Sequence, residues 1–164
     1  MQLNISTCYA MQLMLFLARS DRIVPSSRLS KSLNISPRYV LQIASKLRDG
    51  GLISSHAGMG GGFSLTKETS SISAYDIITL MEGDMSIPEC ASPLSGCDEP
   101  CLNPSLLDTL NTMKEYIVAY LKTITFDKLV SMEISGHLSG ILNLVELHID
   151  EIKKKATLGR VQGL

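Results

Sequence analysis

The stretch that decides the fold covers residues 36–67, SPRYVLQIASKLRDGGLISSHAGMGGGFSLTK. Ser36 is a favourable N-cap, and Pro37 suits the first helical position, where its missing N–H is not needed. The pair Gly50-Gly51 can adopt the left-handed conformation that ends a helix. Between these ends, apolar residues recur at the spacing of a buried helix face, namely Val40, Ile43, Ala44 and Leu47. The sequence therefore predicts a bounded helix with a cationic outer face.

The residues after this helix predict a β-hairpin. Leu52 and Ile53 open one strand, and Phe63 and Leu65 alternate in a second strand with one buried face. The tip between them, AGMGGG at residues 57–62, carries so little side chain that backbone N–H groups can approach phosphate oxygens. A flexible linker is the alternative for this glycine run.

A second short helix is expected ahead of the first, over residues 25–35. Ser26 or Ser27 can cap it, and Asn34 suits the turn that follows. Helix, tight turn, helix and hairpin in this order form a winged helix-turn-helix. We therefore predict a mainly α fold with a small β-wing.

Further helices are predicted on both sides of this unit. Residues 6–19 are almost all good helix formers, with apolar residues around the whole axis, and Asn4 or Ser6 can cap them. Residues 73–82 predict a short helix that packs against the wing.

The C-terminal part predicts amphipathic helices. Ser105 caps a long helix whose apolar period continues for about five turns, and the resemblance described below makes it the dimerisation helix. Residues 132–154 predict another helix for dimer or core packing, with His137 and His148 on its surface.

The net charge of −1 is divided unevenly along the 164 residues. Residues 1–67 carry eight Lys or Arg against two Asp, 8 − 2 = +6, and the remainder carries 7 − 14 = −7. A segregated positive charge attracts phosphate within about one Debye length, roughly 8 Å at physiological salt. No segment has the roughly 18 apolar residues of a membrane span, and no Lys or Arg precedes the short apolar run at residues 11–18. We expect a cytoplasmic protein without a membrane partner.

Three of the four cysteines, Cys90, Cys97 and Cys101, lie in a proline-bearing stretch without helical period. Their spacing, Cys-x6-Cys-x3-Cys, differs from the paired cysteines of zinc fingers. Structural disulfides are uncommon in a reducing cytosol, whereas three thiolates on irregular backbone suit an iron-sulfur cluster. The fourth cysteine, Cys8, falls in the first predicted helix, where a cysteine often packs as a small apolar residue.

Several blocks of the sequence resemble one family of bacterial regulators. They are the opening MQLN with Tyr9-Ala10, then ISPRYVLQIASKLRDGGLISS, the glycine run GMGGGF, and ISAYDIITLMEG. In this order they are similar to winged helix-turn-helix transcriptional regulators of the IscR/NsrR type, in particular the branch that binds iron-sulfur clusters. The resemblance implies a homodimer joined by the long helix and a double-stranded DNA partner.

The resemblance also implies the ligands of a cluster. Cluster-binding members carry three cysteines in this loop, usually as Cys-x5-Cys-x5-Cys, which assigns Cys90, Cys97 and Cys101 to the metal. No His follows Cys101 within a helical turn, whereas some members use such a His as the fourth ligand. NsrR-like members place a carboxylate from the other subunit at the position of Cys8, so Cys8 of the partner subunit is the expected fourth ligand. The alternative is an exogenous ligand, and both [2Fe–2S] and [4Fe–4S] clusters remain open.

The helix-turn-helix predicts which residues meet DNA. Two recognition helices in a dimer read half-sites about one helical turn apart, so the operator should be near-palindromic. The expected contacts are Arg38, Tyr39 and Gln42 at base edges, Ser27, Arg28, Ser36 and Lys46 at phosphates, and His56, Gly58 and Gly60 in the wing. Simple solvation of a helix face is the alternative for Arg38 and Lys46.

Two positions depart from the resemblance. Leu41 stands where many members have Glu, which removes an acidic reader of cytosine. Ala57 stands where the wing commonly has Arg, which removes a probe of the minor groove, and His56 is a weak substitute. We expect an operator that differs from those of better-known members.

The predicted organisation is a winged helix-turn-helix domain at residues 1–83, a cysteine-bearing sensor loop at 84–103, dimerisation helices at 104–154 and a flexible tail at 155–164. The main hypothesis is a repressor whose operator affinity follows an iron-sulfur cluster that senses redox state, nitric oxide or iron-sulfur status. A cluster-free thiol switch on the same fold is one alternative. A cysteine-dependent enzyme is another, although no His lies near the cysteines in sequence.

Overall fold

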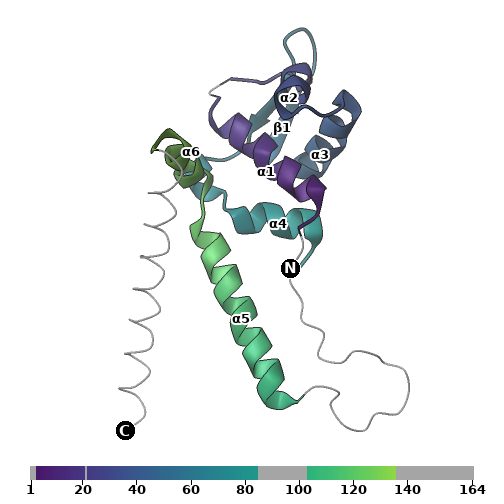
Figure 1. Cartoon of the computed structure of the whole chain (residues 1–164). Coiled ribbons are helices and arrows are strands. Elements are labelled where there is room, and N and C mark those ends of the chain that lie inside the picture. The colour runs from purple at the N-terminus through teal and green to yellow at the C-terminus, as the bar shows by residue number, and fades with distance from the viewer. Residues whose placement is uncertain (1–2, 21, 85–102, 136–164) are drawn as a thin grey trace, which may run out of the picture.

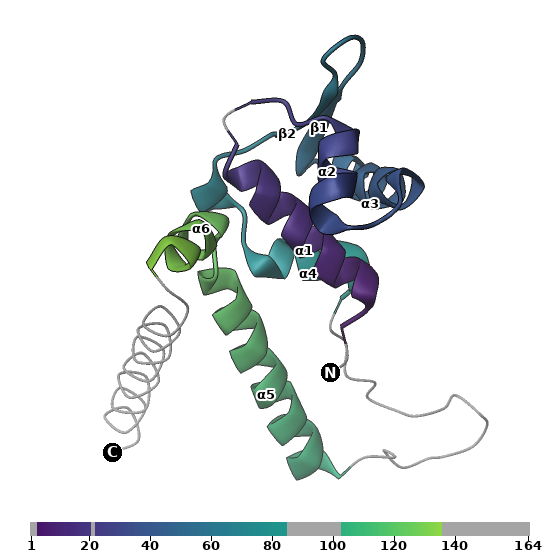
Figure 2. The same ribbon diagram turned by 45° about the horizontal axis from the view of Figure 1, so that its top comes forward.

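The computed structural model describes residues 3–20, 22–84 and 103–135 (Figure 1). The elements are α1 (Ile5–Ala18), α2 (Ser26–Leu33), α3 (Pro37–Asp49), β1 (Ile53–His56), β2 (Gly62–Leu65), the 3-10 turn η1 (Thr69–Ser71), α4 (Ala74–Glu82), α5 (Pro104–Thr123) and α6 (Phe126–Ser135). Most of them gather into one body, from which α5 extends as a long arm (Figures 1 and 2). The predicted mainly α fold with a small β-wing is confirmed.

Helix α1 forms the centre of this body. Asn4 caps it by accepting a hydrogen bond from the Ser6 N–H, and its residues Ala10, Leu13 and Met14 are fully buried. The helix contacts α2, α3, α4, α6 and β2, so its apolar side chains are covered on several sides, as the sequence predicts. It begins and ends one residue earlier than predicted.

A tight turn joins α2 to α3. Asn34 adopts the left-handed conformation (φ 52°), and Ser30 Oγ donates to the Ile35 carbonyl oxygen (2.6 Å) across the turn. The Ser36 side chain caps α3, and Pro37 occupies the first helical turn, both as predicted. Local contacts therefore fix both the turn between α2 and α3 and the start of α3.

The wing consists of β1 and β2, which pair antiparallel with Ile53 opposite Leu65. Val24 and Phe63 exchange two backbone hydrogen bonds of 2.9 Å, which ties the segment before α2 to the hairpin. This bridge leads directly into Pro25, which takes the N-cap position of α2. The predicted side-chain cap at the next two serines is therefore wrong, because the chain enters the helix from the bridge.

Helix α4 begins with a capping box, in which Ser73 accepts from the Asp76 N–H and Asp76 accepts from the Ser73 N–H. Its buried residues Ile77 and Ile78 lie on the side that packs against neighbouring helices. Those neighbours are mainly α1 and α5, with a smaller contact to α3. The sequence predicted that this helix packs against the wing, but the wing is not its main contact.

Helix α5 has no fully buried residue over its 20 residues. Asn103, and not the predicted Ser105, caps it by accepting from the Ser105 N–H (2.9 Å). The cap lies earlier because Pro104 suits the first helical position and has no N–H to satisfy.

After α5 the chain returns to the body. The Ala74 N–H donates to the Ile124 carbonyl oxygen (2.7 Å), and the Phe126 N–H donates to the Ile72 carbonyl oxygen (3.0 Å). Helix α6 then begins at Phe126, earlier than the helix predicted at residues 132–154, and packs against α1 and η1. Most of that predicted helix, with His137 and His148, lies outside the described residues.

Candidate functional site

The outer face of α3 carries hydrogen-bond donors that are available to another molecule. Arg38, Gln42 and Lys46 are all exposed. Within the described ranges, Arg38 and Gln42 form no intramolecular hydrogen bond or ion pair. Arg38 lies in the first turn of α3, the end that helix-turn-helix proteins direct towards base edges. The structure thus presents this pair as the sequence predicts, while their DNA contacts stay a prediction.

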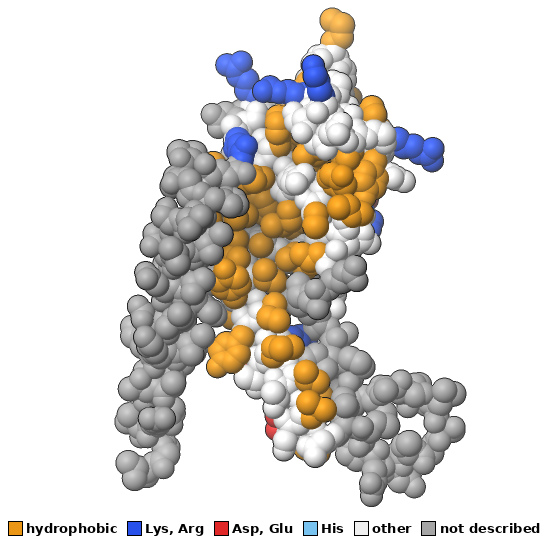
Figure 3. Space-filling view, in the orientation of Figure 1, with side chains coloured by type: hydrophobic (Ala, Val, Ile, Leu, Met, Phe, Trp, Pro, Cys, Tyr) orange, Lys and Arg blue, Asp and Glu red, His pale blue; other side chains and the backbone are white. Residues whose placement is uncertain are grey.

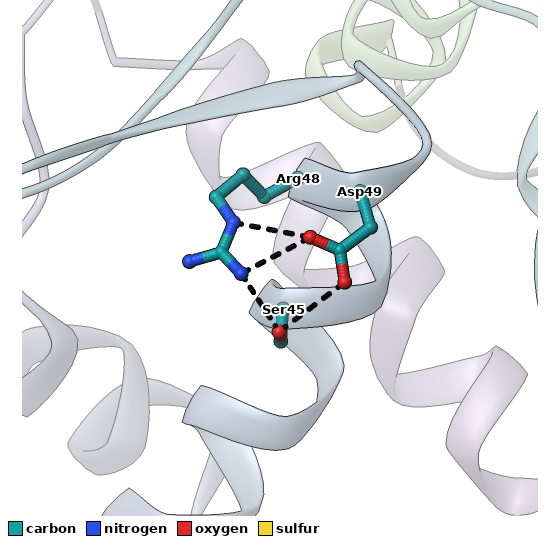
Figure 4. A network of polar contacts seen from close by, with 3 residues as sticks. All are labelled: Ser45, Arg48 and Asp49. Atoms are coloured by element: carbon teal, nitrogen blue, oxygen red, sulfur yellow. Dashed lines mark hydrogen bonds and ion pairs between the residues drawn. The ribbon is translucent and has the colours of Figure 1, made fainter.

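Arg48, farther along the same helix, is engaged within α3 (Figure 4). Its guanidinium donates to Asp49 Oδ1 through Nε (3.2 Å) and Nη2 (3.0 Å), and Nη2 also donates to Ser45 Oγ (3.1 Å). The neighbouring carboxylate therefore offsets the charge of this cation. Arg48 and Arg38 share a helix, but only Arg38 extends an uncompensated guanidinium from it.

Tyr39 faces α1 and does not extend beside Arg38. Its ring is half-buried and meets the Tyr9 ring edge to face, with centroids 5.8 Å apart and an interplanar angle of 83°. Its hydroxyl lies 2.9 Å from Ser6 Oγ. Tyr39 therefore links α3 to the first turn of α1, and the base contact predicted for it stays a prediction.

Two predicted phosphate contacts lie near the start of α2. Ser27 is exposed in the first turn of this helix. The guanidinium of Arg28 lies over the Phe16 ring, 5.6 Å from its centroid, a cation–π contact that orients the side chain. Ser36 Oγ already accepts from the Tyr39 N–H (3.2 Å), but its own hydroxyl proton can still be donated.

The wing tip is built for close approach. Gly58 (φ 98°) and Gly60 (φ 86°) take backbone conformations that favour glycine, and Met59 between them is fully exposed. His56 Nε2 lies 2.9 Å from Ser64 Oγ, across the hairpin. Figure 3 shows Lys and Arg side chains around the upper part of the molecule, with a hydrophobic side chain at its top.

The sequence predicted no DNA contact for either of two exposed apolar residues on this surface, Met59 and Leu41. Both are placed in contact with solvent by their elements, and neither packs against the core. For Leu41 the sequence did carry a signal. The residue falls outside the buried stripe of its helix, so the helical period turns it outwards, although its hydrophobicity alone would suggest a core position.

Glu82, the last residue of α4, is bonded to the first turn of α1. Its Oε1 accepts from the Asn4 N–H (2.8 Å) and from the hydroxyl of the buried Thr7. The exposed thiol of Cys8 belongs to that same turn. The chain therefore leaves α4 beside the turn that carries Cys8, shortly before the segment that contains the other three cysteines.

Replacing Glu82 with glutamine should make folding less sensitive to acid. The Thr7 hydroxyl, then the Asn4 N–H and the charge of Lys46, hold the pKa of Glu82 below its ordinary value of 4.5. Such a carboxylate stabilises the fold above its unfolded pKa and loses this contribution as pH falls through the folded pKa, so unfolding temperatures from about pH 3 to 7 should fall less in the variant. Glu115→Gln, on the exposed side of α5, is the control. Equal pH dependence in Glu82→Gln and wild type would contradict the prediction.

Helix α5 presents an apolar stripe. Leu106, Met113 and Tyr116 are 48%, 52% and 47% exposed, and Leu110 and Ile117 are half-buried on the same side. Figure 3 shows hydrophobic side chains along this arm. Half-exposed side chains at helical spacing are typical of a surface that is covered by another helix.

Cys90, Cys97 and Cys101 lie outside the described residues, so the predicted ligand set is not tested. In the parts of the chain that the structure covers, no three His, Cys, Asp or Glu side chains gather as metal ligands. None of the described helices combines the length and apolarity needed to cross a membrane.

The comparison with protein families decides the assignment. The sequence model of Rrf2, described as an iron-dependent transcriptional regulator, matches residues 3–132. The chain belongs to the Rrf2 family. Its regulators are transcription factors that bind DNA through a winged helix-turn-helix. The predicted class, a transcriptional regulator, is therefore confirmed, and the alternative of a cysteine-dependent enzyme is wrong.

Relatives of this Rrf2 regulator include the HTH-type transcriptional regulator IscR of Klebsiella pneumoniae, which is 32% identical over 144 residues, covering 83% of this chain and 86% of that protein. CymR, the global cysteine regulator of B. subtilis, has a similar structure, with a TM-score of 0.65 at 26% identity over 80% of this chain and 97% of that chain. The oxidized form of Staphylococcus aureus CymR has a TM-score of 0.62 at 28% identity, covering 79% and 96%. The resemblance to the IscR type is therefore confirmed.

Proposed function

We propose that this Rrf2 regulator is a cytoplasmic homodimer that binds a near-palindromic operator and whose affinity follows the state of an iron-sulfur cluster. The observation that carries the DNA-binding part is the outer face of α3, where Arg38 and Gln42 project from a capped helix without intramolecular partners among the described residues. A dimer that occupies promoter DNA would exclude other proteins, so we propose that it acts as a repressor.

The predicted contacts divide into reading and positioning. Arg38 and Gln42 have the donors that pair with guanine and adenine edges in the major groove. Ser27, Arg28 and Lys46 lie where phosphates would fix the register. The wing would reach the adjacent backbone through the N–H groups of its glycines, with Met59 as its apolar tip.

The apolar stripe of α5 supports the homodimer. Pairing of two copies of this helix along the stripe would cover Leu106, Met113 and Tyr116, which the described part of one chain leaves half-exposed. It would also bring two winged bodies together, as a palindromic operator requires.

Met113→Asp should separate the dimer into monomers. An unpaired charge at the centre of an apolar interface costs several kcal/mol, so we expect dimerisation to weaken roughly 100-fold or more. Analytical ultracentrifugation over a concentration series measures this. Thr112→Asp, which adds the same charge at an exposed position of α5, is the matched control and should remain dimeric. A dimeric Met113→Asp variant would place the interface elsewhere.

The donor set fits an iron-sulfur cluster. Cys90, Cys97 and Cys101 offer three thiolates from one segment, and the partner subunit's Cys8 would supply the fourth. Thiolates are the ligands that such clusters take, and a bound cluster supplies one-electron redox chemistry and reactivity towards oxygen or nitric oxide. Two features support this proposal: the thiol of Cys8 is exposed, and Glu82 fixes the end of α4 to its turn.

A route from the thiols to the DNA face follows from Tyr39. Its hydroxyl contacts Ser6 and its ring contacts Tyr9, on either side of Cys8 in the first turns of α1. A change in the position of this turn would therefore act on the first turn of α3. Coupling of about 1–3 kcal/mol between cluster state and operator affinity would make a useful switch.

Purification without oxygen tests the proposal. The protein should be brown, contain iron and acid-labile sulfide, and enrich near-palindromic duplexes from a random-sequence library. Exposure to air or nitric oxide should change the affinity for the enriched duplex. Cys8→Ala should alter the absorption spectrum or the lifetime of the cluster in air, and an unchanged spectrum and decay rate would remove Cys8 from the site.

A cluster-free thiol switch is the second candidate. The similarity to the oxidized form of S. aureus CymR and the exposed thiol of Cys8 favour it. In that case the anaerobic protein would be colourless, and its count of free thiols would fall with peroxide while its affinity for the duplex changes.

A further inference from the structure

Leu41 places an aliphatic side chain on the DNA-facing side of α3. It is 52% exposed and belongs neither to the buried core nor to the half-buried residues that pack against it. Residues three and four positions apart are neighbours on a helix surface, so Arg38 and Ser45 flank it. The folded chain, as far as the structure describes it, makes no use of this side chain for packing.

The charge around Leu41 indicates which kind of molecule would contact it. Single exposed leucines are common on protein surfaces, but this one lies in the first half of the recognition helix. The exposed Lys and Arg side chains of the two helices are Arg38, Lys46 and the Asp49-paired Arg48 on α3, with Arg28 and Lys31 on α2. Such a face favours a polyanion over an apolar protein surface, which commits Leu41 to the DNA major groove.

The chemistry of the major groove restricts what a leucine can read there. Base edges present hydrogen-bond donors and acceptors, and the one apolar group among them is the 5-methyl group of thymine. Leucine cannot accept the N4 hydrogen of cytosine and would leave that donor without a partner. Against the thymine methyl group, the same side chain removes apolar surface from water.

We propose that Leu41 is a specificity-determining residue that selects thymine, through its 5-methyl group, at one base pair of each half-site. This inference rests on the proposed function, because it requires that α3 enters the major groove. It assigns a reading role to a residue that has no polar group, beside the hydrogen-bonding readers Arg38 and Gln42.

The test removes one methyl group at a time from the DNA. The full-length dimer, purified without oxygen, first selects its operator from a random duplex library. Each thymine of one half-site is then replaced by deoxyuridine, symmetrically in the other, and the affinity is measured by fluorescence anisotropy. At one position the wild type should lose about three- to fivefold per half-site, the expected effect of one methyl group withdrawn from an apolar contact.

The matched variant is Leu41→Ala, whose melting temperature should equal that of the wild type because the side chain is outside the core. It should bind the thymine and the deoxyuridine duplexes equally well at that position. Placing cytosine there should weaken the wild type further, and 5-methylcytosine should restore part of the affinity. Leu41→Glu should move the preference from thymine to cytosine.

Three results would overturn the proposal. One is a selected operator in which no thymine shows a methyl effect that depends on Leu41. Another is a Leu41→Ala variant that keeps the thymine preference of the wild type. If the protein selects an operator and loses it on Arg38→Ala but shows either result, the DNA-binding function stands and the role of Leu41 falls. The third result is a wild type that selects no duplex, which would overturn both the DNA-binding function and the role of Leu41.

Discussion

Phe126→Ala should destabilise the protein by about 3–5 kcal/mol, the range for removing a buried aromatic side chain. Phe126 is fully buried and belongs to the same core cluster as residues of α1, α3 and the wing. Its N–H also bonds to the Ile72 carbonyl oxygen, which fixes the entry to α6. The loss should therefore affect the whole winged body, although Phe126 follows the long arm in sequence.

Chemical denaturation followed by far-UV circular dichroism measures this effect. Phe126→Leu, which keeps most of the apolar volume, should cost much less, and Met59→Ala at the fully exposed wing tip should cost nothing measurable. If the free energy of unfolding of Phe126→Ala lies within about 1 kcal/mol of the wild-type value, α6 does not unfold cooperatively with the rest of the body.

Arg38→Ala should weaken operator binding by about tenfold or more, while Arg48→Ala should change it little. Both variants remove one positive charge from α3. Arg38 has no intramolecular partner in the described chain, whereas the Arg48 guanidinium already donates to Asp49 and Ser45. Losing a base-contacting arginine costs about 1–3 kcal/mol and relaxes specificity at one position.

A mobility-shift titration with the selected operator and with a random duplex separates these outcomes. For Arg38→Ala, affinity for the operator should fall more than affinity for the random duplex, since the lost contact is base-specific. A uniform loss in both would make Arg38 a phosphate contact. Equal losses in Arg38→Ala and Arg48→Ala would mean that only the net charge of the helix matters.

Helix α1 connects the two parts of the proposed switch. Its first turn is bonded to the end of α4 through Glu82, contacts α3 through Tyr39, and carries Cys8. A sensor that acts on this turn would need no long pathway to reach the recognition helix. Glu82→Gln tests the bond between this turn and α4, and Cys8→Ala tests the part of this turn in the cluster.

The sequence by itself determined the helix-turn-helix and the wing. Ser36, Pro37 and Asn34 act on their own turns, and the buried stripe of α3 follows from a period of 3.6 residues. Such signals extend over only a few residues, so they are complete in the sequence. The cysteine spacing likewise predicts thiolate chemistry from the sequence, but Cys90, Cys97 and Cys101 lie outside the described residues, so this stays a prediction.

Only the tertiary structure decided which way particular side chains of those elements face. Tyr39 turns to α1 because Tyr9 and Ser6 lie beside it, 30 and 33 positions away (39 − 9 and 39 − 6). Glu82 meets the start of α1 across more than seventy residues, and Phe126 enters the core after an exposed arm. These contacts depend on how the helices pack, which no local propensity specifies. Among the described residues Leu41 does not pack against the core, and its exposed fraction follows only from the placement of its neighbours, although the helical period already turns it outwards.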